Sequence, residues 1–82
     1  MPWLEVIWID GPGGNVEHIA QHGVTMQEVE EVLQNPLDSD VSESSGRPIV
    51  FGRTRAGRFL AVVYEPVDPV TVYPITAFDV EE

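Results

Sequence analysis

The sequence predicts a single α+β domain over residues 1–82, in which an antiparallel sheet carries two helices packed on one face. Two observations indicate this fold class. Residues 15–35 contain two consecutive helix patterns with start and stop signals, whereas the flanking segments are rich in apolar and β-branched residues. A chain of 82 residues also supports only one core of modest size. The expected order of elements is β-α-α-β-β-β.

The first strand is predicted at residues 3–9, where apolar side chains point to both sides and Glu5 is the exception. A turn follows at residues 10–14, which contain three glycines and a proline. Asn15 stands where a helix N-cap is expected, and Gly23 suits the left-handed position that ends a helix. The first helix is therefore short, roughly two turns.

The second helix is predicted to start with a capping box, in which the side chains of Thr25 and Glu28 each bind the other residue's amide. It ends at Asn35, because the residue before a proline avoids the helical region. Residues 37–46 are polar and acidic, so they are expected to form an exposed loop with a short extended piece around Val41.

The C-terminal half is expected to contribute three strands, at residues 48–54, 58–65 and 70–78. A short connection with Gly57 near its end joins the first two strands, and residues 66–69 form the turn before the last strand. Pro74 lies within the last strand and cannot donate a ladder hydrogen bond. It therefore favours an edge position or a β-bulge.

The distribution of charge argues against a nucleic-acid-binding surface. The formal net charge is −10, lysine is absent, and all four basic residues are arginines between residues 47 and 58. Residues 1–46 carry −9, and residues 47–82 carry −1. Proteins that hold a phosphate backbone usually present a basic patch. RNA therefore has only weak electrostatic support as a partner, confined to the arginine-containing segment.

Other bulk features exclude several classes of protein. The chain has no cysteine, which rules out a disulfide framework and a thiol nucleophile. It has no apolar run long enough to span a membrane, and its first ten residues lack the basic region of a signal peptide. A cytoplasmic protein without membrane association is the expectation.

The two histidines lie four residues apart on one helix face, a spacing found in zinc sites. A metal site needs at least a third ligand, and the sequence fixes none near His18 and His22, so no metal or cofactor is expected. His22 lies in the last helical turn, where a protonated imidazole would interact with the negative end of the helix dipole. Packing against the sheet is the other interpretation for either histidine.

Arg53 and Arg58 flank the connection between two predicted strands. Close together, they could bind a phosphate or a carboxylate through paired hydrogen bonds. In the alternative interpretation they pair with the chain's own fourteen acidic residues, or protect an exposed hairpin end.

Several short sequence motifs occur along the chain in one order. Each motif is unspecific alone, and the order makes the combination more specific. The motifs are N-x-x-H-x-x-x-H-G-V-T from Asn15, a helix ending in Asn-Pro, R-P-I-V-F-G from Arg47, G-R-F-L-A-V-V-Y from Gly57, and I-T-A from Ile75. Together they resemble the BrnT-like toxins of the RelE-like ribonuclease toxin superfamily. The resemblance covers about residues 15–78.

The resemblance implies a RelE-like fold and a metal-independent endoribonuclease, the toxin of a type II toxin–antitoxin pair that a protein antitoxin neutralises. It places Arg53, Arg58 and His22 at the catalytic site. These side chains would hold the RNA phosphate, stabilise developing charge and assist proton transfer.

The chain also departs from the family pattern, so we expect a divergent, acidic and catalytically degenerate member. Phe78 replaces the arginine that follows Ile-Ser-Ala in the toxins, and residues 79–82 are acidic where toxins have a basic tail. Loss of one phosphate-binding cation can remove several kcal/mol of transition-state stabilisation. The alternative function is a non-catalytic protein-interaction or regulatory module on the same fold. Its partner would be an antitoxin, another protein or a second copy of the chain in a homodimer.

Overall fold

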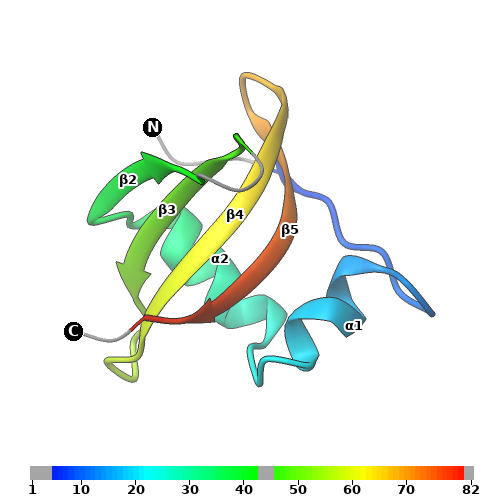
Figure 1. The fold of residues 1–82 in the computed structure, drawn as a ribbon, viewed down its shortest axis with the longest axis horizontal. Helices are drawn as coiled ribbons and strands as arrows, with labels where there is room; N and C mark the ends of the chain where they lie inside the picture. The colour runs from blue at the N-terminus through cyan, green and yellow to red at the C-terminus, as the bar shows by residue number, and fades with distance from the viewer. Residues whose placement is uncertain (1–4, 43–45, 81–82) are drawn as a thin grey trace.

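A five-stranded sheet and two helices make up the computed structural model, which describes residues 5–42 and 46–80 (Figure 1). The elements are β1 (Glu5–Val6), α1 (Asn15–Ala20), α2 (Met26–Gln34), β2 (Asp38–Val41), β3 (Pro48–Arg53), β4 (Phe59–Asp68) and β5 (Thr71–Asp79). The α+β class predicted from the sequence is confirmed.

The sheet is mixed, with the strand order β1-β5-β4-β3-β2. The strands from β2 to β5 pair antiparallel, whereas β1 runs parallel to β5. The prediction of a wholly antiparallel sheet is therefore wrong at β1. The predicted element order also lacked β2. This strand pairs with β3 through its backbone and exposes all four of its side chains, so it has no apolar pattern.

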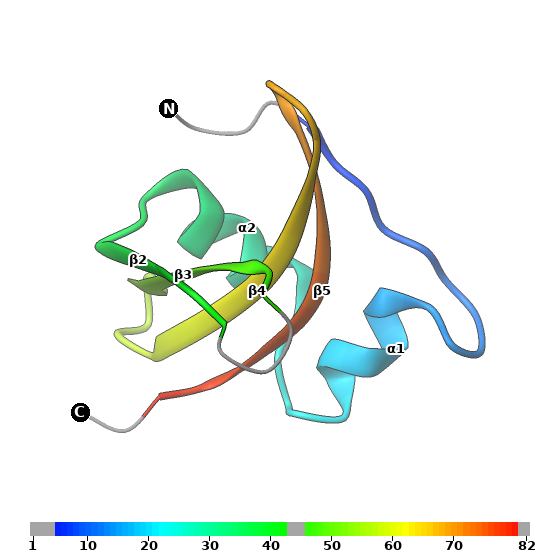
Figure 2. The ribbon, with the colours of Figure 1, turned by 45° about the horizontal axis from the view of Figure 1, so that its top comes forward.

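Both helices pack on one face of the sheet, as predicted (Figures 1 and 2). Helix α1 lies against β5, and α2 lies across β3 and β4. The core between the two layers is aliphatic: Ile19, Val24, Val29, Val32, Leu33, Val50, Leu60, Val62, Val72 and Ala77. Burial of this apolar area supplies the main favourable term in folding.

The opposite face of the sheet carries a smaller apolar cluster that no helix covers within the described residues. Its buried members are Ile49, Ala61 and Val63, and half-buried Phe51, Phe78 and Val80 pack against them.

The first strand is shorter than the predicted segment of residues 3–9. Residues 1–4 lie outside the described residues, and the ladder with β5 comprises only Glu5 and Val6. The N–H of Ile7 makes one more bond to the carbonyl of Val72 at 3.0 Å, after which the chain leaves the sheet.

The last two strands differ from the prediction at their shared turn. Strand β4 extends into the predicted turn at residues 66–69 and ends at Asp68, so that the turn lies at residues 69–70 and β5 starts only at residue 71. The predicted irregularity at Pro74 is confirmed. Tyr64 pairs with Pro74, whereas the residue before Tyr64 pairs with Thr76, and this register shift leaves Ile75 as a bulge.

The capping box at the start of α2 is present as predicted. The N–H of Glu28 donates to Oγ1 of Thr25 at 3.2 Å, and the N–H of Thr25 donates to Oε1 of Glu28 at 3.0 Å. Gly23 has a φ of 72°, so its expected left-handed conformation after α1 is also confirmed.

Asn15 has a different role from the predicted helix N-cap. The capping residue is Gly14, and Asn15 is the first residue of α1, with only 3% of its surface exposed. Its Oδ1 accepts from the N–H of Ile9 at 2.8 Å, and its Nδ2 donates to the carbonyls of Ile7 and Pro74, both at 2.9 Å. The side chain thus joins three segments of backbone, namely the start of α1, residues 7–9 and β5, and satisfies polar groups that would otherwise be buried without partners.

Gly52 allows α2 to approach β3 closely. A Cβ atom at this position would lie 3.2 Å from Cγ1 of Val32 and 3.3 Å from the carbonyl oxygen of Asn35. We expect Gly52→Ala to lower the free energy of unfolding by about 1–2 kcal/mol, because the added methyl group forces the helix away from the sheet. Urea denaturation measures the change. Stability equal to that of the wild-type protein would contradict the close packing.

Candidate functional site

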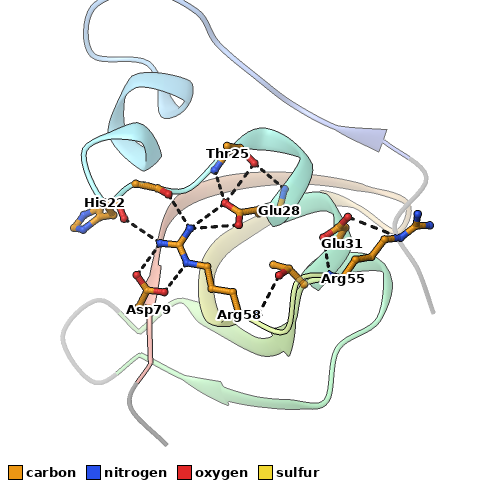
Figure 3. A network of polar contacts seen from close by, with 9 residues as sticks. His22, Thr25, Glu28, Glu31, Arg55, Arg58 and Asp79 are labelled. Atoms are coloured by element: carbon orange, nitrogen blue, oxygen red, sulfur yellow. Dashed lines mark hydrogen bonds and ion pairs between the residues drawn. The ribbon is translucent and has the colours of Figure 1, made fainter.

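The candidate site lies where the β3–β4 hairpin meets the link between the helices, and Arg58 is at its centre (Figure 3). The hairpin turn is closed by two bonds, from the N–H of Thr54 to the carbonyl of Arg58 at 2.9 Å and from the N–H of Gly57 to the carbonyl of Thr54 at 2.8 Å. The buried hydroxyl group of Thr54 also accepts from the N–H of Arg58 at 3.2 Å. These contacts fix the backbone from which the Arg58 side chain projects toward α2.

The guanidinium group of Arg58 is surrounded by acceptors from the chain itself. Nε and one terminal nitrogen donate to the two carboxylate oxygens of Asp79, at 2.6 and 2.7 Å. The other terminal nitrogen donates to the carbonyl of Gly23 at 2.8 Å and to the carboxylate of Glu28 at 3.1 Å. The carbonyl of His22 accepts a longer bond at 3.5 Å. An arginine has five N–H donors, and these contacts engage all of them.

Electrostatics stabilise this arrangement. The hydrogen bond to Asp79 is the main cause of a pKa of Arg58 above its usual range, and Glu28 adds to the effect while partial burial opposes it. The same hydrogen bond holds the pKa of Asp79 below its usual range. One cation faces two carboxylates, so the cluster carries a net charge of −1. Its field therefore repels a phosphate group.

A pH titration tests the pairing of Asp79 with Arg58. The folded-state pKa of Asp79 is lowered, so its contribution to stability is present above the unfolded pKa of about 4 and is lost as the pH falls through the folded value. We expect urea unfolding of the wild-type protein to show a larger acid-induced loss of stability than unfolding of Asp79→Asn. Parallel profiles for the two proteins would contradict the pairing.

A second ion pair extends the cluster along α2. The carboxylate of Glu31 accepts from the backbone N–H of Arg55 at 3.1 Å and lies 3.9 Å from Nε of its side chain. A hollow of about 530 Å³ separates the hairpin from α2. Its lining contains the pairs that Arg58 forms with Glu28 and Arg55 forms with Glu31. The lining residues are Gly23, Thr25, Gln27, Glu28, Glu31, Thr54, Arg55, Ala56 and Arg58.

The structure places Arg53 apart from Arg58. Arg53 pairs with Phe59 across the hairpin, and its guanidinium lies 5.1 Å from the centre of the Phe59 ring on the helix-free face of the sheet. It also donates to the carbonyl of Gly57 at 2.8 Å. Arg58 precedes Phe59 and projects to the helix-covered face, because successive side chains of a strand alternate. The two arginines therefore do not form a common anion site, and Arg58 pairs with acids of the chain itself.

His22 lies beside Arg58, but only its backbone carbonyl faces the guanidinium (Figure 3). Its exposed ring is 5.6 Å from the ring of His18 and 6.5 Å from that of Phe78. Within residues 5–42 and 46–80, no group of three or more His, Cys, Asp or Glu side chains is arranged to hold a metal ion. The catalytic roles assigned to Arg53, Arg58 and His22 stay predictions.

Asp79 is the residue of this site that the sequence analysis missed. It was assigned to an acidic tail, whereas the structure places it at the end of β5, paired with Leu60. Leu60 is two residues from Arg58, so Arg58 and Asp79 are diagonal neighbours on one face of the sheet. Side chains alternate along a strand, so the side chain of Asp79 lies on the same face of β5 as that of buried Ala77. This alternation could have placed Asp79 beside Arg58 only if the strand register had been known.

The fold and the site together define a small α+β domain whose central arginine is neutralised by its own carboxylates. No family model, curated protein or solved structure matches this chain. No helix among the described residues is long and apolar enough to cross a membrane.

Proposed function

We propose that this chain is a non-catalytic interaction module on a scaffold similar to that of the BrnT-like toxins, and that it binds a basic segment of another protein. The observation that carries this proposal is the saturation of Arg58. A catalytic arginine must offer donors to a phosphate, but those of Arg58 are engaged by Asp79, Glu28 and two backbone carbonyls.

The charge of the whole chain supports the same proposal. At a net charge of −10, long-range forces disfavour the approach of RNA and favour a cationic partner. A basic antitoxin-like protein is one partner of this kind.

A residual ribonuclease is the second candidate, because His22 and Arg58 lie side by side and the imidazole of His22 is accessible. In such an enzyme the imidazole would transfer a proton at the ribose 2′-hydroxyl, and Arg58 would have to exchange a carboxylate for the phosphate.

Expression of the chain in bacteria, with growth and RNA integrity as readouts, distinguishes the two candidates. We expect no growth arrest and no RNA cleavage at a high protein level confirmed by immunoblot. His22→Gln is the matched variant, because it removes the imidazole from an exposed site without touching the Arg58 side chain. RNA cleavage by the wild-type protein that disappears in His22→Gln would overturn the proposal.

A further inference from the structure

The free edge of β2 has an unusual arrangement of backbone groups. In this antiparallel pair, the N–H of Ser42 donates to the carbonyl of Arg47 at 2.8 Å, and the register pairs Asp40 with Ile49. Hydrogen-bonded pairs alternate with non-bonded pairs in such a ladder. The N–H and C=O groups of Ser39 and Val41 therefore point away from β3, toward the free edge.

Both of these outward N–H groups are already occupied. The carboxylate of Asp38 accepts from the N–H of Ser39 at 2.8 Å, and the carboxylate of Asp40 accepts from the N–H of Val41 at 2.7 Å. The donors of the edge are masked, while its outward carbonyls and the two carboxylates remain as acceptors. An ordinary strand needs both donors and acceptors to extend a sheet, so this edge resists unspecific pairing.

A hollow of about 420 Å³, with both polar and apolar residues in its lining, lies next to the masked edge, between β2 and the C-terminal end of α2. It is lined by Leu33, Pro36, Leu37, Asp38, Ser39, Val50 and Tyr64. Leu37 is 66% exposed and Val41 is 59% exposed, so apolar side chains flank the acceptors. The last turn of α2 contains no basic residue, which leaves the negative end of the helix dipole uncompensated.

We propose that the β2 edge and this hollow bind a short segment of a partner protein in which arginine or lysine alternates with apolar residues. Cationic side chains supply donors to Asp38, Asp40 and the outward carbonyls, and apolar side chains enter the hollow. A second copy of the chain is a poor occupant, because two such edges would oppose acceptor to acceptor and carboxylate to carboxylate. This inference rests on the proposed function and specifies its surface.

Fluorescence anisotropy with a labelled peptide of alternating arginine and valine tests the surface. We expect the double variant Asp38→Asn, Asp40→Asn to bind this peptide about tenfold more weakly than the wild-type protein. Asparagine keeps the oxygen that masks the edge, so the change isolates charge. The matched control, Glu5→Gln with Asp10→Asn, removes two charges near β1 at the opposite end of the sheet and should change the affinity less than about twofold.

The double variant Asp38→Ala, Asp40→Ala tests the masking. It frees the two outward N–H groups, so we expect self-association in size-exclusion chromatography with light scattering, whereas the asparagine variant stays monomeric. If the alanine variant stays monomeric, the carboxylates of Asp38 and Asp40 do not protect the β2 edge from pairing.

The outcomes also separate this inference from the proposed function. If the asparagine variant binds the peptide as tightly as the wild-type protein, the β2 edge is not the binding surface, but the proposed function stays intact. Absence of peptide binding overturns the surface as well. RNA cleavage that depends on His22 overturns the proposed function itself.

Discussion

Replacing Arg58 by methionine should lower the free energy of unfolding by about 2–3 kcal/mol. The variant leaves the carboxylates of Glu28 and Asp79 close together without a cation, and the carbonyl of Gly23 loses its donor. The Arg58 side chain is only 28% exposed, so solvent replaces these contacts incompletely. Urea denaturation followed by tryptophan fluorescence measures the change.

Arg55→Met is the matched control for this experiment. Arg55 lies on the same hairpin and forms an ion pair with Glu31, but its side chain is 91% exposed. Exposed pairs contribute less than about 1 kcal/mol, so this variant should retain nearly full stability. Arg58→Lys should fall between the two, because it keeps the charge and loses the paired bonds to Asp79. Equal effects of Arg58→Met and Arg55→Met would contradict the structural role of Arg58.

Replacing Asn15 by leucine should be more damaging, with a loss of about 4 kcal/mol in the free energy of unfolding. Asn15 is buried and makes three hydrogen bonds to backbone groups of Ile7, Ile9 and Pro74. Each buried group left without a partner costs about 1–3 kcal/mol. The same denaturation experiment measures the effect.

Two further variants refine this prediction. Asn15→Asp retains the acceptor for Ile9 but turns a carboxylate oxygen toward two carbonyls, so we expect it to be at least as destabilising as the leucine variant. Asn35→Leu is the control at an exposed asparagine and should cost less than about 1 kcal/mol. A similar loss for Asn15→Leu and Asn35→Leu would show that Asn15 does not join the three segments.

The sequence predicted elements whose signals are local. The capping box of Thr25 and Glu28, the left-handed Gly23 and the bulge at Pro74 all depend on a few neighbouring residues. Strand β2 was expected only as a short extended piece around Val41, because edge pairing through the backbone leaves no apolar pattern. The role of Asn15 was misassigned because one of its partners, Pro74, is 59 residues away in the sequence.

The candidate site was less predictable than the fold. The short distance between Arg53 and Arg58 along the chain allowed two interpretations, a shared anion site or pairing with the chain's own acids. The pairing of Arg53 with Phe59 places the two side chains on opposite faces of the sheet. Strand register, which local sequence does not determine, thus decided the environment of both arginines. The chain's excess of acids was the more useful signal, since Arg58, Arg55 and Arg47 each have an acidic partner.

The central claim is that this domain recognises a cationic protein segment and does not act on RNA. Anisotropy titrations of the wild-type protein at low salt, with a labelled single-stranded RNA and with the arginine–valine peptide, test it most directly. We predict saturable binding of the peptide that weakens as salt is added, and no binding or cleavage of the RNA. Binding and cleavage of the RNA, with no affinity for the peptide, would contradict the claim.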